Sequence, residues 1–228
     1  KLPNSSTAKA ETVAEAIMNR HKNVKTVFAQ TSAVAGDFRL RSLKHVAGEN
    51  RTVTVHRESG CCFAVDVESC YFSPRLLHER LRIARLVQPD EVVVNMFAGV
   101  GCFSIIIAKH SQAAKIFSID MNPTAMAFME ENIRRNRVYC KVIPLLGDAK
   151  EIITARLQRC ADRVLIPLPE KAFAYLPCAA SALKTSGGWI HVHAFEHALK
   201  TANPVDKVRQ KVEETLDASG VDFEVAPV

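Results

Sequence analysis

Two glycines stand two residues apart directly after an apolar run, in the sequence VVVNMFAGVGCFS at residues 92–104. Gly99 and Gly101 have no side chain, so a ligand can approach the backbone closely at this turn. The pattern lacks the third glycine of the dinucleotide-binding fingerprint, and by itself it is only a weak indication of nucleotide binding. It predicts a ligand-binding turn where an apolar strand passes into a helix.

Acidic residues follow the next two apolar runs and strengthen this prediction. The run KIFSID ends in Asp120, whose carboxylate could accept both hydroxyl groups of a ribose. After KVIPLL comes GDAKE, in which Asp148 could accept a hydrogen bond from an adenine amino group. Both acids have an ordinary alternative role, because aspartate often caps the helix that follows it. Three such features at the ends of three consecutive strands favour one shared nucleoside site.

These residues can meet only if the strands that carry them end at one edge of a sheet. After Pro89, the apolar strands VVVNMF, KIFSID, KVIPLL, RVLIPL and WIHVHAF alternate with the helical stretches FSIIIAKH, PTAMAFMEENIRRN, AKEIITARLQ, EKAFAYLPCAASALK and NPVDKVRQKVEETLDAS. The strands are apolar almost throughout, as expected when helices cover both faces of a sheet. We therefore predict an α/β fold with a doubly wound sheet for residues 86–228.

The first part of the chain, residues 1–85, follows a different pattern. AKAETVAEAIMNRH spaces its apolar residues like one face of a helix, which Ser6 or Thr7 could cap. After the short run VKTVFAQ, the stretches DFRLRSLKHVAG, RTVTVHRESG and CCFAVDVESCYF alternate with period two and predict strands of an antiparallel sheet. SPRLLHERLRIARLV predicts a helix with Ser73 as its cap and Pro74 at its first position. We predict a smaller α+β module here.

Charge is distributed unevenly between these two parts. The formal net charge is +6, and residues 1–85 hold 14 Lys and Arg against 8 Asp and Glu, whereas residues 86–228 hold 16 of each kind. The excess in the first part favours a nucleic-acid-docking module joined to a neutral catalytic one. A chance distribution of surface charge explains the same numbers.

Composition places the chain among globular proteins. With 228 residues, of which 48% are hydrophobic and 24% charged, it can bury a core. It has no apolar run of about 18 residues and no signal-peptide core, so we expect a soluble, cytoplasmic protein. The seven cysteines lack a CxxC pair, and the histidines, His191 and His193 included, lack metal-ligand spacing, which predicts reduced thiols and no metal site. Without an initial methionine, and with a final VDFEVAPV that alternates like half of a strand pair, we expect part of a larger protein.

Several segments together resemble one known family. A glycine turn with two acids is the adenosine-recognition set of S-adenosylmethionine-dependent methyltransferases. The segments FRLRSLKHVAGE, TVHRESGC, YFSPRLLHER, NMFAGVGCFSI and IDMNPTA resemble the archaeal and eukaryotic tRNA (guanine(37)-N1)-methyltransferases and their wybutosine-pathway relatives, over nearly the whole chain. The resemblance implies a Rossmann-like class I methyltransferase domain after a basic middle module, and a separate amino-terminal domain that this sequence does not contain. It also implies S-adenosylmethionine as cofactor and the tRNA anticodon loop as partner; we expect a monomer with no membrane partner.

The resemblance assigns catalytic roles to two residues. Glu79 in SPRLLHER matches the glutamate proposed to remove the guanine N1 proton, and Arg39 in DFRLR matches the arginine that stabilises negative charge on O6. Each has an ordinary alternative. Glu79 could pair with Arg75 or Arg82 on its own helix, and Arg39 could be surface charge on a strand.

Further residues are expected to bind the two substrates. The expected cofactor-binding residues are Tyr71, Phe97, Gly99, Gly101, Asp120, Met121, Asp148 and Pro167. The expected RNA-binding residues are Arg41, Lys44, Arg75 and Arg80. Tyr71 is alternatively a core residue. Arg39 and Arg41 fall on one face of a strand by the period-two rule, which favours a neighbouring phosphate contact for Arg41.

Two positions depart from the family pattern. Asn95 stands where the first motif usually opens with aspartate, which removes a negative charge near the sulfonium. Pro167, in IPLPEK, stands where the family has an Asn-Leu-Pro-like stretch, and a proline offers only its carbonyl. The resemblance first implies methyl transfer to N1 of guanosine 37. Pro167 leaves open a wybutosine-pathway transfer, either methylation at another atom or aminocarboxypropyl transfer. Pro167 and Asn95 together also leave open a tRNA-binding relative without catalysis, against which the intact Glu79, Arg39 and glycine turn speak.

Overall fold

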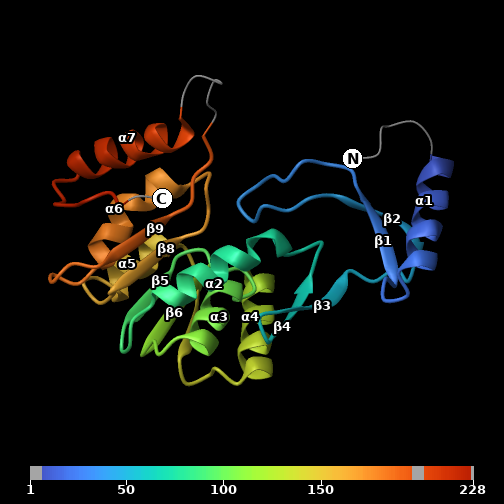
Figure 1. The fold of residues 1–228 in the computed structure, drawn as a ribbon, viewed down its shortest axis with the longest axis horizontal. Coiled ribbons are helices and arrows are strands. Elements are labelled where there is room, and N and C mark those ends of the chain that lie inside the picture. The colour runs from blue at the N-terminus through green and yellow to red at the C-terminus, as the bar shows by residue number, and fades with distance from the viewer. Residues whose placement is uncertain (1–6, 197–202, 227–228) are drawn as a thin grey trace.

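The computed structural model describes residues 7–196 and 203–226, and its largest sheet has five parallel strands (Figure 1). The strands are β5 (Val92–Asn95), β6 (Lys115–Asp120), β7 (Val142–Leu146), β8 (Arg163–Ile166) and β9 (Trp189–Val192). Their spatial order is β7-β6-β5-β8-β9. The chain thus winds outward from β5 in both directions, and sheets of this kind bind ligands at the carboxyl ends of the strands near the point of reversal.

Helices cover both faces of this sheet (Figure 1). One face carries α2 (Leu77–Leu86), α3 (Cys102–His110) and α4 (Pro123–Asn136), and the other carries α5 (Ala149–Arg156), α6 (Ala172–Ala182) and α7 (Pro204–Asp217). Val93 and Val94 are adjacent in β5, and their side chains belong to the cores on opposite faces. Burial from both sides explains why the strands are apolar throughout, and the predicted doubly wound α/β fold is confirmed.

The ends of α4 show how local sequence determines a helix. The Asn122 side chain accepts hydrogen bonds from the backbone N–H groups of Thr124 and Ala125, and Pro123 occupies the first helical position. The helix ends where Arg137 adopts a left-handed conformation with φ of 57°. The predicted stretch PTAMAFMEENIRRN coincides with the observed helix.

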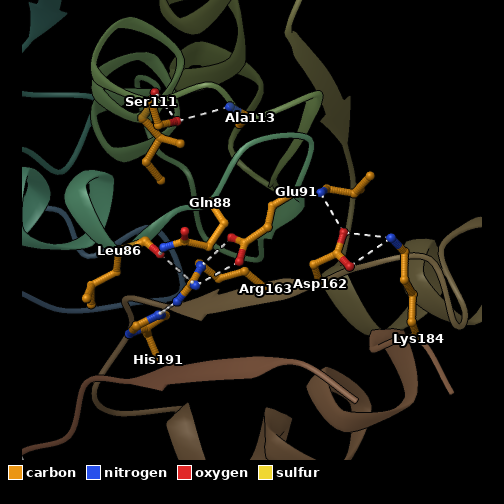
Figure 2. Close-up of polar contacts among 11 residues, drawn as sticks. Leu86, Gln88, Glu91, Ser111, Ala113, Asp162, Arg163, Lys184 and His191 are labelled. Atoms are coloured by element: carbon orange, nitrogen blue, oxygen red, sulfur yellow. Dashed lines mark hydrogen bonds and ion pairs between the residues drawn. The ribbon is translucent and has the colours of Figure 1, made fainter. Parts of the chain in front are cut away.

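A buried polar cluster joins the amino-terminal ends of the central strands to α2 (Figure 2). The Arg163 guanidinium donates to both carboxylate oxygens of Glu91, at 2.8 and 3.0 Å, and to the Leu86 carbonyl at 3.0 Å. Its third nitrogen lies 2.6 Å from Nε2 of His191. Burial, and then the Arg163 charge, lower the pKa of His191 to about 3, so its neutral ring can accept this bond. His191 therefore has a structural role.

The first part of the chain contains one helix and two separate strand pairs. These are α1 (Thr7–Arg20), β1 (Thr26–Gln30) with β2 (Leu43–Gly48), and β3 (Val53–Glu58) with β4 (Cys61–Asp66); both pairs are antiparallel. The helix is confirmed, although Ser6, one of its two predicted caps, lies outside the described residues. The prediction of a single sheet is wrong, because β2 pairs with β1 whereas β3 pairs only with β4.

The stretch DFRLRSLKHVAG is not one strand. Residues 36–39 form a turn closed by the bridge between Ala35 and Leu40, and Arg39 has a positive φ of 55°. The strand itself begins only at Leu43. The prediction that Arg39 and Arg41 share a strand face is therefore wrong, because a turn breaks the period-two alternation between them.

The β3–β4 hairpin and α2 pack directly against the parallel-sheet unit. The Asn132 side chain of α4 exchanges two hydrogen bonds with the Ala64 backbone, at 2.7 and 2.9 Å. Phe63 and Ile83 lie in the same core as Ile105. The core is thus continuous across residue 85, where the two predicted domains meet, and the division into domains at that residue stays a prediction.

Two smaller predictions fail at the ends of elements. Ser73 makes no side-chain capping bond, and the chain passes through a single 3₁₀ turn, η1 (Pro74–Leu76), before α2 begins. Residues 221–226 form no strand, although their sequence alternates; Val221, Phe223 and Val225 pack against the core beneath α6 and α7 instead. Among the described residues, no helix combines the length and apolar character needed to cross a membrane.

Candidate functional site

A pocket lies at the carboxyl ends of β5 and β6. Phe97, Gly99, Asp120, Met121, Asn122 and Ala125 line it from the loops that follow these strands and the start of α4, together with Tyr71. Pro167, Leu168 and Lys171 line it from the loop after β8, and Asp37, Phe38 and Arg39 from the turn between β1 and β2. The pocket therefore combines the expected edge of the sheet with a turn from the first part of the chain.

Asp120 organises the glycine turn. One carboxylate oxygen accepts the Gly99 backbone N–H at 2.6 Å and the other accepts that of Asn122 at 2.9 Å. Burial raises the pKa of Asp120, while these two hydrogen bonds act in the opposite direction. The nearest non-neighbouring heavy atom to a Cβ added at Gly99 would be the Tyr71 carbonyl oxygen, at 3.8 Å. The backbone beside Asp120 is thus open for a ligand.

Gly101 serves a different purpose from Gly99. It precedes α3 with φ of 91°, and an added Cβ would lie 2.8 Å from Met129 Cγ and 3.1 Å from Ile105 Cδ1. It does not line the pocket. The need for glycine at this position comes from the close packing of α3 on α4, so its role in cofactor binding stays a prediction.

Asp148 is occupied by structural contacts. Its Oδ1 accepts the backbone N–H groups of Lys150 and Glu151 at the start of α5, and its Oδ2 accepts the Tyr175 hydroxyl at 2.5 Å. Burial raises the pKa of Asp148, but these hydrogen bonds outweigh it and lower the pKa. The capping alternative is confirmed. The carboxylate does not line the pocket; Phe97, which does, packs edge-to-face on Tyr175, with the two ring centres 4.9 Å apart.

Arg39 is held over the pocket by two neighbours. Its guanidinium carbon lies 4.1 Å from the centre of the Tyr71 ring, and one terminal nitrogen lies 2.9 Å from Oε1 of Glu170. Its Nε atom is buried and has no hydrogen-bond partner among the described residues. Arg39 and Tyr71, both predicted from the family resemblance, are thus brought together with Gly99 and Asp120, and one donor of Arg39 is left for a ligand.

Glu79 lies in the first turn of α2, outside the pocket lining. Its carboxylate accepts two hydrogen bonds from Arg82, at 2.7 and 2.8 Å, and lies 3.0 Å from Nε2 of His193, just beyond β9. Burial raises the pKa of Glu79, but the bonds from Arg82 and His193 prevail and lower it to about 2. The alternative pairing with Arg82 is present. To act as a base, this carboxylate must give up at least one of these donors.

The expected RNA-binding residues differ in accessibility. Lys44 and Arg75 are exposed, and Arg41 is half-buried with one nitrogen 3.4 Å from the Phe72 carbonyl. Arg80 is only 3% exposed, and its guanidinium donates to Glu58 at 2.6 Å and to the Ser73 carbonyl at 2.8 Å. The prediction that Arg80 binds RNA is wrong, because its charge is buried and already paired inside the protein.

The two departures from the family pattern occupy different places. Asn95 is fully buried and donates to the Ser104 hydroxyl at 3.1 Å, while its Oδ1 has no partner among the described residues. Pro167 lines the pocket, as its sequence position suggests. Within the described part of the chain, no group of three His, Cys, Asp or Glu side chains is placed to hold a metal ion.

Sequence reasoning missed part of the pocket wall. Asp37, Phe38, Leu168 and Lys171 line the pocket, and Glu170 reaches Arg39 from just outside it. The sequence contained one indication, because GDFRLR and PLPEK each place an acid and a base within two residues of one another. Nothing in the sequence shows that these charges face one another.

This chain is similar in sequence to known tRNA methyltransferases. The profile described as the TRM5/TYW2 methyltransferase domain matches residues 54–222. Trm5b of Pyrococcus abyssi, a tRNA (guanine(37)-N(1))-methyltransferase, is 40% identical over 99% of this chain and 64% of its own length. Taw21 of Saccharolobus solfataricus, a tRNA 4-demethylwyosine(37)-methyltransferase, is 37% identical over 85% of this chain and 72% of its own. The chain thus spans less than two thirds of the length of the Trm5b relative.

Solved structures agree with these sequence matches. The crystal structure of Pyrococcus abyssi Trm5b superposes with a TM-score of 0.85, at 40% identity over 99% of this chain and 64% of that one. A complex of aTrm5 with tRNALeu gives 0.78, at 36% identity over 92% and 59%. Methanocaldococcus jannaschii TYW2 in complex with AdoMet gives 0.63, at 33% identity over 76% and 77%.

Proposed function

The chain belongs to the TRM5/TYW2 methyltransferase family, and from that premise we propose that it transfers the methyl group of S-adenosylmethionine to N1 of guanosine 37 in tRNA. The observation that carries the proposal is the pocket, in which Gly99 and Asp120 of the glycine turn face Arg39 across one space. The similarity to Trm5b over 99% of the chain supports the choice of guanosine N1. Recognition of the anticodon loop and action in the cytoplasm belong to the same proposal.

The pocket residues fit S-adenosylmethionine. Asp120 keeps carboxylate lone pairs beyond its two backbone bonds, and these suit the hydroxyl groups of a ribose. Phe97 and Met121 offer apolar surface for an adenine, and Gly99 leaves the backbone open beside it. When bound, the cofactor supplies a methyl group on a positively charged sulfur.

Arg39 and Glu79 divide the work on the guanine in this proposal. Removal of the N1 proton leaves negative charge on O6, and the Arg39 guanidinium, with its unpaired Nε donor, can stabilise that charge. The Glu79 carboxylate takes the N1 proton after its hydrogen bond to Arg82 or His193 is replaced by one to the guanine. Arg82 and His193 keep the Glu79 carboxylate ionised. It can therefore accept a proton once one of their hydrogen bonds is displaced.

A second function is favoured by Pro167. It lines the pocket and offers a carbonyl acceptor where the family has a polar side chain, so the base can be held differently. The similarity to Taw21, over most of both chains, supports the same alternative. This function would be transfer to another atom of a tricyclic guanosine, of a methyl or an aminocarboxypropyl group.

Nucleoside mass analysis separates these functions. The chain is incubated with S-adenosylmethionine and a tRNA transcript that carries guanosine 37, and a transcript with adenosine 37 serves as control. We expect 1-methylguanosine only from the first transcript. A methyl or aminocarboxypropyl adduct formed only on tRNA that carries 4-demethylwyosine would establish the second function, and tRNA binding without any mass change would indicate a relative without catalysis.

Calorimetry tests the cofactor site independently of the reaction. We expect S-adenosylmethionine to bind, and Asp120→Ala to weaken binding by about 1 to 3 kcal/mol, because a charged acceptor is lost. Asp162→Ala is the matched control. Asp162 directly precedes β8, at the amino-terminal ends of the strands and therefore away from the pocket, and it pairs with Lys184. Equal affinity of the Asp120 variant and the parent protein would remove Asp120 from the site.

A further inference from the structure

We propose that Asp37, Glu170 and Lys171 are positioning residues that hold the turn at residues 36–39 over the pocket and thereby aim Arg39. Lys171 Nζ lies 2.6 Å from Asp37 Oδ1, and Arg39 Nη2 lies 2.9 Å from Glu170 Oε1. We call these contacts the crossed ion pairs. The inference deepens the proposed function and rests on it for the role of Arg39.

The order of the charges selects one arrangement of the two segments. In the turn, the acid Asp37 precedes the base Arg39; in the loop after β8, the acid Glu170 precedes the base Lys171. Each residue pairs with its opposite charge. A shift that brought Asp37 to Glu170 and Arg39 to Lys171 would place like charges together, which is unfavourable. The crossed ion pairs therefore attract the turn to the loop after β8 and also favour one position of the turn along that loop.

Each of the two segments has a shape of its own. The turn is closed by backbone hydrogen bonds between Ala35 and Leu40 and from Arg39 N–H to the Gly36 carbonyl. The loop leads directly into α6, whose first residue, Ala172, is fully buried, and Lys171 N–H donates to the Leu168 carbonyl. Two preformed segments meet, so side-chain contacts can decide their relative position.

Glu170 controls the direction of the Arg39 side chain. It binds one terminal nitrogen, and the Tyr71 ring supports the face of the guanidinium. Nε remains inside without a partner among the described residues, which leaves a donor for a negatively charged oxygen. Glu170 itself does not line the pocket, so it acts through Arg39.

Both pairs are also accessible to solvent ions. The side chains of Asp37 and Glu170 are 66% and 52% exposed. Salt screens such pairs, so the hold on the turn should weaken as ionic strength rises. Such exposed pairs contribute little to the stability of the fold and are suited to adjusting the position of a turn.

A charge swap tests the Asp37–Lys171 pair through cofactor affinity. Asp37→Lys and Lys171→Asp are made singly and together, and S-adenosylmethionine binding is measured by calorimetry. We expect each single reversal to lower affinity about tenfold or more and the double variant to recover most of it, as for directly coupled residues. Glu131→Lys is the control, because it breaks the exposed Arg135–Glu131 pair of α4, away from the pocket, and should leave affinity unchanged.

Glu170 is tested through the rate of the chemical step. Glu170→Ala should slow single-turnover methyl transfer about tenfold to a hundredfold with cofactor affinity nearly unchanged, because Arg39 loses its orientation. Glu170→Gln keeps an oxygen acceptor and should recover most of the rate. A merely structural residue would lower the melting temperature and the affinity together.

Two results would overturn the inference: a double charge variant as weak in cofactor binding as the single ones, or a Glu170→Ala protein that reacts at the parent rate. Failure of the proposed function looks different. If the parent protein binds the cofactor and follows the charge-swap pattern but methylates no guanosine 37, the positioning pairs stand and the reaction has been misassigned.

Discussion

At the scale of single residues, the acids of this protein are distinguished by the partners that they already have. Asp120 accepts two backbone donors and lines the pocket, whereas Asp148 accepts three bonds, from the start of α5 and from Tyr175, and does not line it. Glu79 has the strongest partners, Arg82 and His193. Place in the pocket lining, more than residue type, distinguishes Asp120, the proposed cofactor ligand, from Asp148.

Replacing the two residues proposed to act on guanine, Glu79 and Arg39, should have different effects on the reaction. Glu79→Gln should leave tRNA and cofactor affinity nearly intact and slow the chemical step by about 10² to 10⁴, the usual contribution of a general base. The defect should shrink as pH rises, because solvent increasingly takes the N1 proton. Arg39→Ala should slow the step without recovery at high pH, because it removes charge stabilisation.

A single-turnover pH series on both variants measures this difference. The series needs saturating tRNA and cofactor, so that only the chemical step is compared. A Glu79→Gln protein that reacts at the parent rate would show that this glutamate only joins α2 to Arg82 and His193, and the base would have to be another group.

At the scale of elements, the turn between β5 and α3 separates two requirements for glycine. Gly101→Ala should lower the free energy of unfolding by about 1 to 3 kcal/mol, since the new methyl group meets Met129 and φ is 91°. Gly99→Ala has open space around it, so it should cost about 1 kcal/mol of backbone strain and act mainly on cofactor binding. Chemical denaturation and calorimetry on both variants test the contrast; equal losses of stability would contradict it.

Glu79 also connects two elements, and this makes stability depend on pH. Its pKa is lowered from 4.5 to about 2 in the folded protein. The unfolded chain therefore binds the proton first, so the contribution of Glu79 is fully present above about pH 5 and disappears as pH falls toward 2. Near neutral pH, Glu79→Gln should lower the free energy of unfolding by about 2 kcal/mol.

Urea denaturation at several pH values measures this effect. The difference between the parent protein and the Glu79→Gln variant should close between about pH 5 and pH 2. Glu131→Gln, which changes an exposed glutamate of α4, provides the control for general acid effects. A difference that stays constant down to pH 2 would show that Glu79 is not stabilised as an anion.

At the scale of the whole molecule, the uneven charge predicts where RNA binds. Lys44 and Arg75 are exposed in the basic first part of the chain, and Arg41 is partly accessible, whereas Arg80 is internal. In Figure 1 the β1–β2 pair lies apart from the parallel sheet, and the turn between its strands extends toward α6. We therefore expect a tRNA that reaches the pocket to contact this pair.

Neutralising Arg41 and Lys44 together should weaken binding to many tRNAs alike. The slope of log affinity against log salt should become less steep by about two, because two phosphate contacts no longer release counterions. Lys115→Gln is the control, because Lys115 is the exposed first residue of β6, at the strand end away from the pocket. Unchanged affinity and slope in the double variant would locate the RNA surface elsewhere. Isolated residues 86–228 are unsuitable for this test, because the core continues across residue 85.

What the sequence determined by itself was local. Apolar runs, caps and a glycine turn predicted the five parallel strands and the helices α1 to α7, because these depend on neighbours a few residues away. The edge of the sheet that carries Gly99 and Asp120 followed from the same pattern, since parallel strands must end together. The family resemblance brought in Arg39 and Tyr71, which the structure places in that pocket.

Only the tertiary structure decided which charges are free. Arg80 looks like the exposed arginines near it in the sequence, yet it is buried and forms an ion pair with the equally buried Glu58. Glu79 meets His193 114 residues away, and Lys171 meets Asp37 across 134 residues. The turn at residues 36–39 is closed by local backbone hydrogen bonds, but its ion pairs to Glu170 and Lys171 join it to the loop after β8. Spacing along the chain carries no information about pairs this far apart, so the wall of the pocket and the state of its acids emerge only when the chain is folded.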